Sequence, residues 1–503
     1  MISTKVLMIL FDGAEWNVIR PLLQAGSLPN FAALMRAGSY GPLRSLEGVA
    51  LASPILWTSM ASGKMPAKHG VKDFFDTAQS VQCTRLWEIF EHDGLPIGLF
   101  RYLITWPPRQ TKGFIVPDWC ARTPDTYPAE LGFINRMSQA RDWRSLLRNG
   151  ALAARHGMRL KSALRAGREA IRERIGRRSR LDVYAPQRLV ELAIHTDVFV
   201  RLVRRHQPYY ATFYSGLPDA VHHQYWKFME PEKFNDVSPA EVRRYGPAIP
   251  RTYDAIDRAL GRLLRLAGPE TFVVVASDHG GEANVLEEYR WADVRGDDLV
   301  RILGLSRAMS AFRIGSRTYL RLRPAATLAE TIDEIAERVR GATLVGSSAP
   351  LFEVEVSGSD EMSVKVVYLK QSMDGARIQF RDGRTFPAGE LLNLTPTISG
   401  NHSMHGILLV RGPGVRRNNE IDGASLLDVT PTVLALLGRA VGRDMDGHVL
   451  IDAIEPEFLR RTPVTYIDSY DEVLGRREGQ PPDDSTVGMD EVQARLRALG
   501  YID

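Results

Sequence analysis

The sequence predicts an α/β protein with a doubly wound, mostly parallel sheet and helices on both of its faces. Short and almost uninterrupted apolar runs are typical of strands buried on both faces of a parallel sheet. They occur at residues 5–11, 97–100, 271–276 and 407–410. Segments with helical periodicity separate these runs, as expected for strand–helix–strand units. A change of character near residue 310 predicts a small α+β insert over residues 310–388.

Length and composition restrict the class of protein. The chain has 503 residues, which suggests about three domains at about 150 residues each. Hydrophobic residues make up 44% and charged residues 25%, which excludes a disordered chain, a collagen and a coiled-coil rod. No apolar run reaches the ~20 residues of a membrane span. The first run ends at Asp12, so we do not expect it to be the core of a signal peptide. Because Cys83 and Cys120 are too few for a disulfide framework, we expect a cytoplasmic protein with reduced thiols.

The N-terminal part, residues 1–130, is expected to be the first part of the core. Its first strand ends at Asp12, and a helix is predicted over Pro29–Ala37. Ser53 and Pro54 form a helix-start pair, with serine as the N-cap and proline as the first helical residue. We expect this helix to end near Gly63.

Positive charge is concentrated in one segment. Net charge is +4, but residues 141–180 hold 13 Lys/Arg and 3 Asp/Glu, so the rest of the chain is at about −6. Within this window Leu160, Leu164, Ile171 and Ile175 fall on one helical face. We predict a basic helical insert over residues 131–185 that packs as a cap beside the active site and favours anionic substrates. The alternatives are a solvated surface helix and peripheral membrane contact; local basicity does not favour nucleic-acid binding.

The rest of the chain completes this organisation. Residues 186–309 are expected to be the second part of the core, with strands at 209–214 and 271–276 and helices at 219–228 and 253–263. The insert has strands at 318–322, 352–356 and 363–369 and a helix begun by the capping-box pattern Thr327-x-x-Glu330. Residues 389–455 form the third part, with a helix over Leu426–Leu437. Residues 456–503 form a tail with a Pro-Pro linker and a terminal helix over Glu491–Tyr501.

Six Asp and His residues lie near the ends of predicted strands or the start of a helix. Ligands of doubly wound sheets bind at the carboxyl ends of the strands, so we expect these residues to converge there. Asp219 and His223 are four residues apart and share a helical face. The others are Asp12, the adjacent pair Asp278 and His279, and His402 in a loop before the last strand. Mixed carboxylate and imidazole ligation suits Zn²⁺ or Mn²⁺ better than Mg²⁺ alone.

These stretches resemble the type I phosphodiesterase/nucleotide pyrophosphatase group of the alkaline phosphatase superfamily, and most closely its branch of predicted phosphohydrolases or phosphomutases. The resemblance covers residues 5–130, 186–300 and 390–455. The stretches that carry it are Val6–Gly13, Ser53–Pro54 through Gly63–Gly70, Asp219–His223, Ser277–Gly280, Gly400–His402 through Gly412–Gly414, and Asp446–Leu450. The implied fold is alkaline phosphatase-like.

The resemblance also implies the site residues. Two metal ions would be bridged by the substrate phosphate. One ion would be held by Asp12, Ser53, Asp278 and His279, and the other by Asp219, His223 and His402. Ser53 takes the position of the family nucleophile. His69, His222 and His405 lie near motif residues but are not expected to be ligands, and His69 is expected to order the loop after the nucleophile helix.

One position departs from the family pattern. Nucleotide pyrophosphatases have an asparagine that supports the phosphoryl oxygen, and Phe74 occupies its place here. Lys64, Lys68 and Lys72 are candidates for a replacement positive charge. The sulfatase branch fits less well, because neither cysteine has the required Pro-Arg setting.

We therefore expect a two-metal phosphohydrolase that cleaves a phosphodiester or phosphomonoester through a phosphoseryl intermediate on Ser53. The metals would be Zn²⁺ first and Mn²⁺ second, and the substrate a small anionic phosphate ester. The alternative on the same site is phosphoryl transfer to an acceptor or mutase chemistry. A non-catalytic binding protein on a retained fold is a different class, disfavoured because every expected ligand is present.

Overall fold

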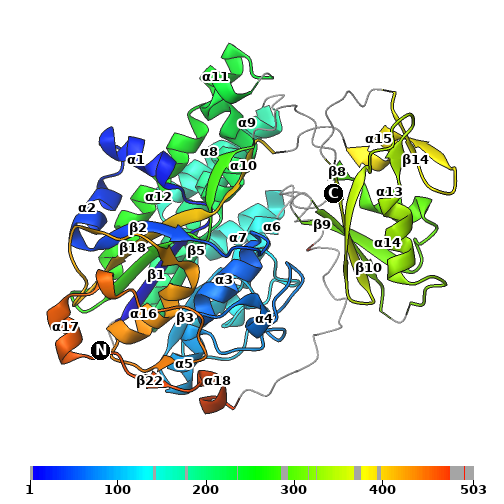
Figure 1. The fold of residues 1–503 in the computed structure, drawn as a ribbon. Helices are drawn as coiled ribbons and strands as arrows, with labels where there is room; N and C mark the ends of the chain where they lie inside the picture. The colour runs from blue at the N-terminus through cyan, green and yellow to red at the C-terminus, as the bar shows by residue number, and fades with distance from the viewer. Residues whose placement is uncertain are drawn as a thin grey trace. The chain divides into compact units, whose positions relative to one another are not determined.

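The computed structural model describes residues 4–139, 143–175, 179–234, 236–284, 293–314, 317–324, 326–367, 375–393, 398–475 and 492. The chain divides into two compact units (Figure 1). The first unit combines Met1–Ala283 with Gly400–Ser485, and the second combines Asn284–Ser399 with Thr486–Asp503. Cys83 and Cys120 are buried in the first unit as free thiols. None of the helices in the described ranges is long and apolar enough to cross a bilayer.

A nine-stranded sheet of the described residues forms the centre of the first unit. Strand β1 (Val6–Phe11) lies between β5 (Tyr210–Ser215) and β6 (Phe272–Ala276) and is parallel to both. Every residue of β1 is buried, because its apolar run faces a helical layer on each side of the sheet. The register pairs Phe11 with Ser215 and Leu10 with Ala276, so the three strands end at one edge.

The outer strands extend the sheet in both directions. The order is β19-β2-β18-β6-β1-β5-β3-β4, with β20 also paired with β2. Strand β18 is antiparallel to both of its neighbours. The sheet is therefore mixed but mostly parallel, which confirms the predicted fold class. The bounds are β2 (Ser39–Arg44), β3 (Ile97–Phe100), β4 (Phe114–Val116), β18 (His405–Arg411), β19 (Asn419–Glu420) and β20 (Ala424–Ser425).

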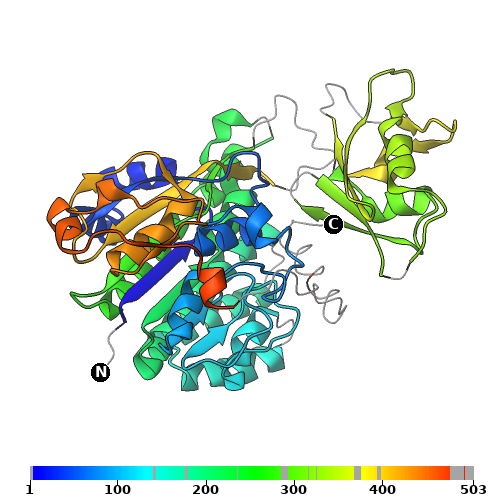
Figure 2. The same cartoon turned by 60° about the horizontal axis from the view of Figure 1, so that its bottom comes forward.

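Helices cover both faces of this sheet (Figures 1 and 2). One layer contains α2 (Pro29–Ala37), α9 (Arg180–His206) and α12 (Ala248–Leu263), with α10 (Leu217–Met229) packed on α12. The other contains α3 (Ser53–Ser62), α5 (Leu86–His92) and α16 (Val429–Leu436), and α3 contacts both of the others. All ten residues of α3 are buried, so this helix is held on every side.

Several predicted elements differ from the structure. Helix α1 (Trp16–Gln24) was not predicted, because Pro21 interrupts its pattern; the Glu15 side chain caps it by accepting from the Asn17 N–H. The capping box of the insert is Thr331 with Glu334, not Thr327 with Glu330, and it begins α14 (Ile332–Arg340). The predicted linker and terminal helix lie outside the described residues, apart from Val492.

The basic segment is helical but belongs to the first unit. It forms α6 (Phe133–Gln139), α7 (Trp143–Arg155) and α8 (Leu160–Ile175), and α8 packs along α9. Its apolar stripe faces outward. Leu160, Leu164 and Ile171 are 75%, 66% and 59% exposed, while the buried Ser162 hydroxyl bonds to Asp197 of α9. The side chain of Ile175 lies outside the described residues.

The second unit is an α+β body. Its antiparallel sheet has the order β12 (Phe352–Ser357), β13 (Glu361–Val366), β10 (Arg317–Leu322), β9 (Met309–Ile314). It begins at Asn284, earlier than the expected insert over 310–388. The reason is that α13 (Gly296–Ile302) buries Leu299 and Val300 in the same core as Leu320 of the sheet.

Candidate active site

The ends of three parallel strands bring the first carboxylates together. Asp12 follows β1, Asp278 follows β6, and Asp219 lies in the first turn of α10 after β5. The Asp12 N–H donates to the Ser215 carbonyl, and the Asp219 N–H donates to the Asp12 carbonyl at 3.0 Å. All three side chains are buried. The convergence expected at the carboxyl edge of the sheet is present in the structure.

A glycine allows this close approach. Gly13 has a φ of +72°, and a Cβ there would lie 2.8 Å from both Cα and Cβ of Asp219. A side chain at this position would therefore collide with the start of α10, in a backbone conformation that L-residues avoid.

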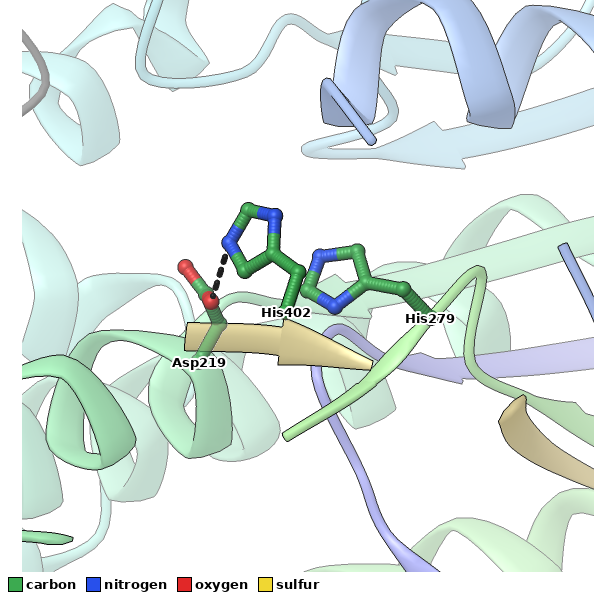
Figure 3. Close-up of side chains that lie close together, drawn as sticks. All are labelled: Asp219, His279 and His402. Atoms are coloured by element: carbon green, nitrogen blue, oxygen red, sulfur yellow. Dashed lines mark ion pairs between the residues drawn. The ribbon is translucent and has the colours of Figure 1, made fainter. Parts of the chain in front are cut away.

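Asp219, His223 and His402 form the first group of candidate ligand atoms. His223 Nε2 lies 3.1 Å from Asp219 Oδ1, one helical turn away. His402 Nε2 lies 3.2 Å from the same oxygen (Figure 3). It also lies 3.1 Å from His223 Nε2. His402 was expected in a loop but lies in β17 (Gly400–Ser403), which pairs with β7 (Gly280–Ala283). This pairing is between segments far apart in sequence, so local β-propensity did not indicate it.

The second group consists of Asp12, Asp278 and His279. His279 Nε2 lies 3.1 Å from Asp12 Oδ1 and 3.9 Å from Asp278 Oδ1. The His279 ring also stacks on the His402 ring, with centroids 3.8 Å apart, so His279 reaches both groups (Figure 3). All three residues are buried and have one ligand atom within 4.8 Å of the others.

The imidazoles of His223, His279 and His402 are oriented in the same way. Nδ1 of each ring contacts a backbone carbonyl, and Nε2 faces the carboxylates. Nδ1 of His223, His279 and His402 lies 2.7–2.8 Å from the carbonyls of Gly400, Gly280 and Leu51, respectively. A carbonyl only accepts, so each Nδ1 carries the proton. In the neutral ring Nε2 is then an unprotonated acceptor, as metal-binding histidines require.

The buried carboxylates fit a cation. Among the described residues, neither oxygen of Asp278 nor Asp12 Oδ1 has a hydrogen-bond partner. Burial, together with the charge of Asp12, raises the pKa of Asp278 well above its usual value. Burial acts to lower the pKa of His279, but Asp278 and Asp12 raise it well above the usual value. Orphaned buried carboxylate oxygens are costly, and divalent cations would satisfy them.

The start of α3 is tied to both groups. His402 donates to the Leu51 carbonyl, and Trp57 Nε1 donates to Asp12 Oδ2 at 3.2 Å. Ser53 lies between these two contacts and is 3% exposed. It was expected to be the N-cap, but Ala52 has the extended N-cap conformation and Ser53 is the first helical residue.

Because Ser53 is the first helical residue and not the N-cap, the free hydrogen-bond donors at the start of α3 differ from those expected. The Ile55 N–H already donates to the Ala52 carbonyl, and Pro54 has no N–H. Among the described residues, Ser53 has no hydrogen-bond partner for its N–H or its hydroxyl. Thr58, Ser59 and Ser62 of the same helix all have partners for their hydroxyls. Ser53 is therefore the hydroxyl of α3 that is buried and uncommitted.

Other histidines near the motifs have structural contacts. His222 Nε2 bonds to the Tyr253 hydroxyl, and its ring packs on Trp226, so it is turned away from Asp219. His69 is buried between Ser59 and the Val71 N–H. His405 is exposed at the start of β18.

The position expected for the family asparagine is apolar. Phe74 is buried against Trp119, with ring centroids 5.5 Å apart. Lys64 pairs with Asp444 and Asp471 at 2.5 and 2.6 Å, and Lys68 pairs with Asp446 at 2.6 Å. These two charges are thus matched by carboxylates of the C-terminal segment. Lys72 is exposed.

Three supporting residues were missed by sequence reasoning. The Tyr214 hydroxyl and Trp57 Nε1 both donate to Asp12 Oδ2. Glu15 accepts from the Gly281 N–H and the Ser403 hydroxyl, and so joins β7 to β17; burial raises its pKa. The sequence contains only weak indications of these roles. Glu15 lies three residues after Asp12, whereas Tyr214 and Trp57 resemble ordinary core residues.

A set of three buried carboxylates and three imidazoles, two buried and one partly buried, lies beside an uncommitted serine at the carboxyl edge of an α/β sheet. Such a set is typical of metal-dependent phosphoryl-transfer enzymes. Residues 6–371 match the family described as type I phosphodiesterase/nucleotide pyrophosphatase, and the chain belongs to this family. It is thus a phosphoric ester hydrolase of the alkaline phosphatase superfamily, a group that generally depends on divalent metals.

Solved structures resemble the chain more distantly. Human ectonucleotide pyrophosphatase/phosphodiesterase 5 is similar with a TM-score of 0.47 and 13% identity, over 91% of this chain and 99% of that protein. None of the curated proteins matches the sequence. The family assignment therefore rests on the sequence match.

Proposed function

We propose that this protein is a two-metal phosphohydrolase that cleaves a small anionic phosphodiester or phosphomonoester through a phosphoseryl intermediate on Ser53. The observation that carries the proposal is the shared arrangement of His223, His279 and His402. Each directs Nε2 toward buried carboxylates while a backbone carbonyl holds Nδ1. Three rings held in this way indicate a site built for cations rather than a chance cluster.

The residues divide into two ligand sets. Asp12, Ser53, Asp278 and His279 would hold one ion, and Asp219, His223 and His402 would hold the other. Mixed nitrogen and oxygen donors favour Zn²⁺, with Mn²⁺ as the second choice. Bound divalent ions would supply Lewis-acid stabilisation of the phosphoryl oxygens and would lower the pKa of a coordinated hydroxyl.

The protein residues account for the rest of the chemistry. Ser53 Oγ attacks phosphorus in line and loses its proton to solvent, while the bond to the leaving oxygen breaks and that oxygen takes up a proton. Water then attacks the phosphoseryl phosphorus, releases the phosphate and restores the Ser53 hydroxyl. Trp57 and Tyr214 fix Asp12 by hydrogen bonds, and α3 fixes Ser53 because every residue of that helix is buried.

The test is a metal-reconstitution experiment. The protein is stripped with a chelator and reloaded with Zn²⁺ or Mn²⁺. Bound metal is counted by elemental analysis, and hydrolysis is measured on panels of phosphomonoesters, phosphodiesters and sulfate esters. We expect about two ions per chain and activity on phosphate esters that returns with the metal. Activity that survives complete metal removal contradicts the proposal. Binding of a single ion, with none held by Asp219, His223 and His402, also contradicts it.

Product analysis with an added alcohol distinguishes hydrolysis from transfer. A hydrolase releases phosphate or a phosphomonoester in proportion to substrate loss. A transferase or mutase instead puts the phosphoryl group on the acceptor.

A further inference from the structure

The exposed face of α8 is apolar along one stripe. Leu160, Leu164 and Ile171 lie within about 40° of one another on a helical projection at 100° per residue. They are exposed because α8 rests on α9 through the opposite face, where the buried Ser162 hydroxyl donates to Asp197 at 2.5 Å. This bond fixes the rotation of α8, so the stripe cannot turn inward without losing a buried partner.

Basic side chains border this stripe on one side. Lys161, Arg165 and Arg168 are exposed, and on the same projection they lie about 40–100° beyond Leu164. An apolar stripe bordered by Lys and Arg is typical of helices that lie in a membrane interface. Charge of one sign along this border makes a second copy of the chain a poor partner, since two such borders repel.

An arginine-lined cavity lies at the N-terminal end of α8. It has a volume of about 390 Å³, and its lining includes Arg159, Arg201, Arg204, Arg262 and Arg265. Asp197 pairs with Arg262 at 2.5 Å. Within the described part of the chain, the other four arginines make no ion pair. Four uncompensated guanidinium groups around one cavity favour an anion, and phosphate oxygens match their geometry.

This cavity, here called the arginine pocket, is distinct from the candidate active site. Arg201 and Arg204 lie in the last two turns of α9, which leads into the amino end of β5. Arg262 and Arg265 lie at the end of α12 and just beyond it, before the amino end of β6. The pocket is therefore at the amino edge of the sheet, whereas Asp12 and Asp278 are at the carboxyl edge.

The pocket and the stripe adjoin along the chain. Arg159 lines the pocket and directly precedes Leu160 of the stripe. Gly157 has a φ of +104°, and a Cβ there would lie 2.7 Å from Cβ of Arg201, so this glycine lets the segment before α8 lie against α9. An anionic phospholipid has a phosphate group next to apolar acyl chains, and these two parts match the arginine pocket and the apolar stripe.

We propose that α8 docks this protein on a membrane surface that contains anionic phospholipids. Leu160, Leu164 and Ile171 enter the acyl boundary, while Lys161, Arg165 and Arg168 lie among the headgroups. The arginine pocket binds the phosphate of one lipid. The proposal is independent of the metal site and of Ser53.

The test is vesicle flotation with the full chain. Vesicles of phosphatidylcholine are compared with vesicles that also contain phosphatidylserine, at low and high salt. We expect binding to the anionic vesicles that weakens as salt rises. The stripe variant L160S/L164S/I171S is expected to bind at least tenfold more weakly, because three apolar side chains no longer enter the bilayer. The pocket variant R204S/R265S is expected to lose several-fold in affinity.

Matched controls exclude general effects of charge and hydrophobicity. I451S/V473S removes exposed apolar side chains of the same unit, and R36S/R251S removes exposed arginines that make no ion pair in the described residues. Both controls should bind as the wild type does, and thermal melting should show all variants to be folded. Equal binding by the stripe variant, or equal binding to both vesicle types, overturns the proposal.

Two further outcomes also count against it. Inorganic phosphate could bind in the arginine pocket, with loss in R204S/R265S, while no vesicle binds; the pocket would then serve a soluble phosphate. Sedimentation could instead show a dimer that L160S/L164S/I171S dissociates, and the stripe would then be covered by a second copy.

Discussion

Replacing Asp278 with asparagine tests the metal hypothesis through stability rather than turnover. Asp278 is 0% exposed, and neither of its oxygens has a hydrogen-bond partner in the described structure. Burial and the neighbouring Asp12 raise its pKa well above the usual value. Without metal, the native state must either hold a proton on this carboxyl or bury its charge, and both cost stability relative to an unfolded chain that ionises freely.

The magnitude follows from linkage. A carboxyl that stays protonated at pH 7 forgoes up to about 4 kcal/mol, at about 1.4 kcal/mol for each pH unit above its usual pKa. Asparagine removes this term but buries an amide without partners, at about 1–3 kcal/mol. We therefore expect metal-free Asp278→Asn to be more stable than the wild type by about 1–3 kcal/mol at pH 7.

The difference in stability between Asp278→Asn and the wild type depends on pH. Because the native pKa is raised, the contribution of Asp278 to stability is complete below its usual pKa and is lost as pH rises toward the native pKa. The advantage of Asp278→Asn should therefore be largest at neutral pH and shrink as pH falls toward about 4.

The assay is denaturant unfolding with a chelator and with Zn²⁺. Zinc at about 100 times its dissociation constant should add about 2.7 kcal/mol to the wild type and much less to the variant, so most or all of the variant's advantage in stability disappears. Asp118→Asn is a matched control, since Asp118 is also buried with a raised pKa but accepts the Cys120 N–H. A metal-free Asp278→Asn protein that is less stable than the wild type, or zinc stabilisation equal in both, refutes the reasoning.

Three other outcomes are expected. Ser53→Ala should lower kcat by several orders of magnitude with metal content retained, while Ser59→Ala has little effect; a substrate analogue that traps the intermediate should label Ser53, and near wild-type turnover of Ser53→Ala would exclude the covalent route. Burial lowers the pKa of His69 to about 4, and its Nδ1 accepts the Val71 N–H. Stability should thus fall by up to about 3 kcal/mol as pH drops from 6.5 to 4, and His69→Gln should flatten this slope in acid-titration melts. Gly13→Ala should cost about 2–4 kcal/mol and reduce metal content, because its Cβ would collide with Asp219; a melting temperature equal to that of the wild type would contradict this.

The sequence predicted those features that have local signals. The strand at residues 6–11 and the helix Pro29–Ala37 follow from apolar runs and from proline and glycine at the helix ends. The convergence of Asp12 and Asp278 followed from the rule that parallel strands end at one edge. These predictions needed no knowledge of which distant segments pair.

Features set by distant contacts were not predictable. His402 lies in a strand because β17 pairs with β7, more than 100 residues earlier. The sequence showed that α8 has an apolar stripe, but amphipathicity does not say what covers such a face. Ser162 and Asp197 decide the rotation of α8, and no periodicity in the sequence reports that bond.

The pairing of β7 with β17 also bears on how this enzyme can change. In the register Ala283 lies opposite Gly400, so the chain leaves the first unit and returns to it at adjacent backbone positions. An entire folded body, Asn284–Ser399, is thus inserted where a hairpin turn would suffice. Evolution can enlarge or exchange that body while the pairing that places His279 and His402 stays unchanged.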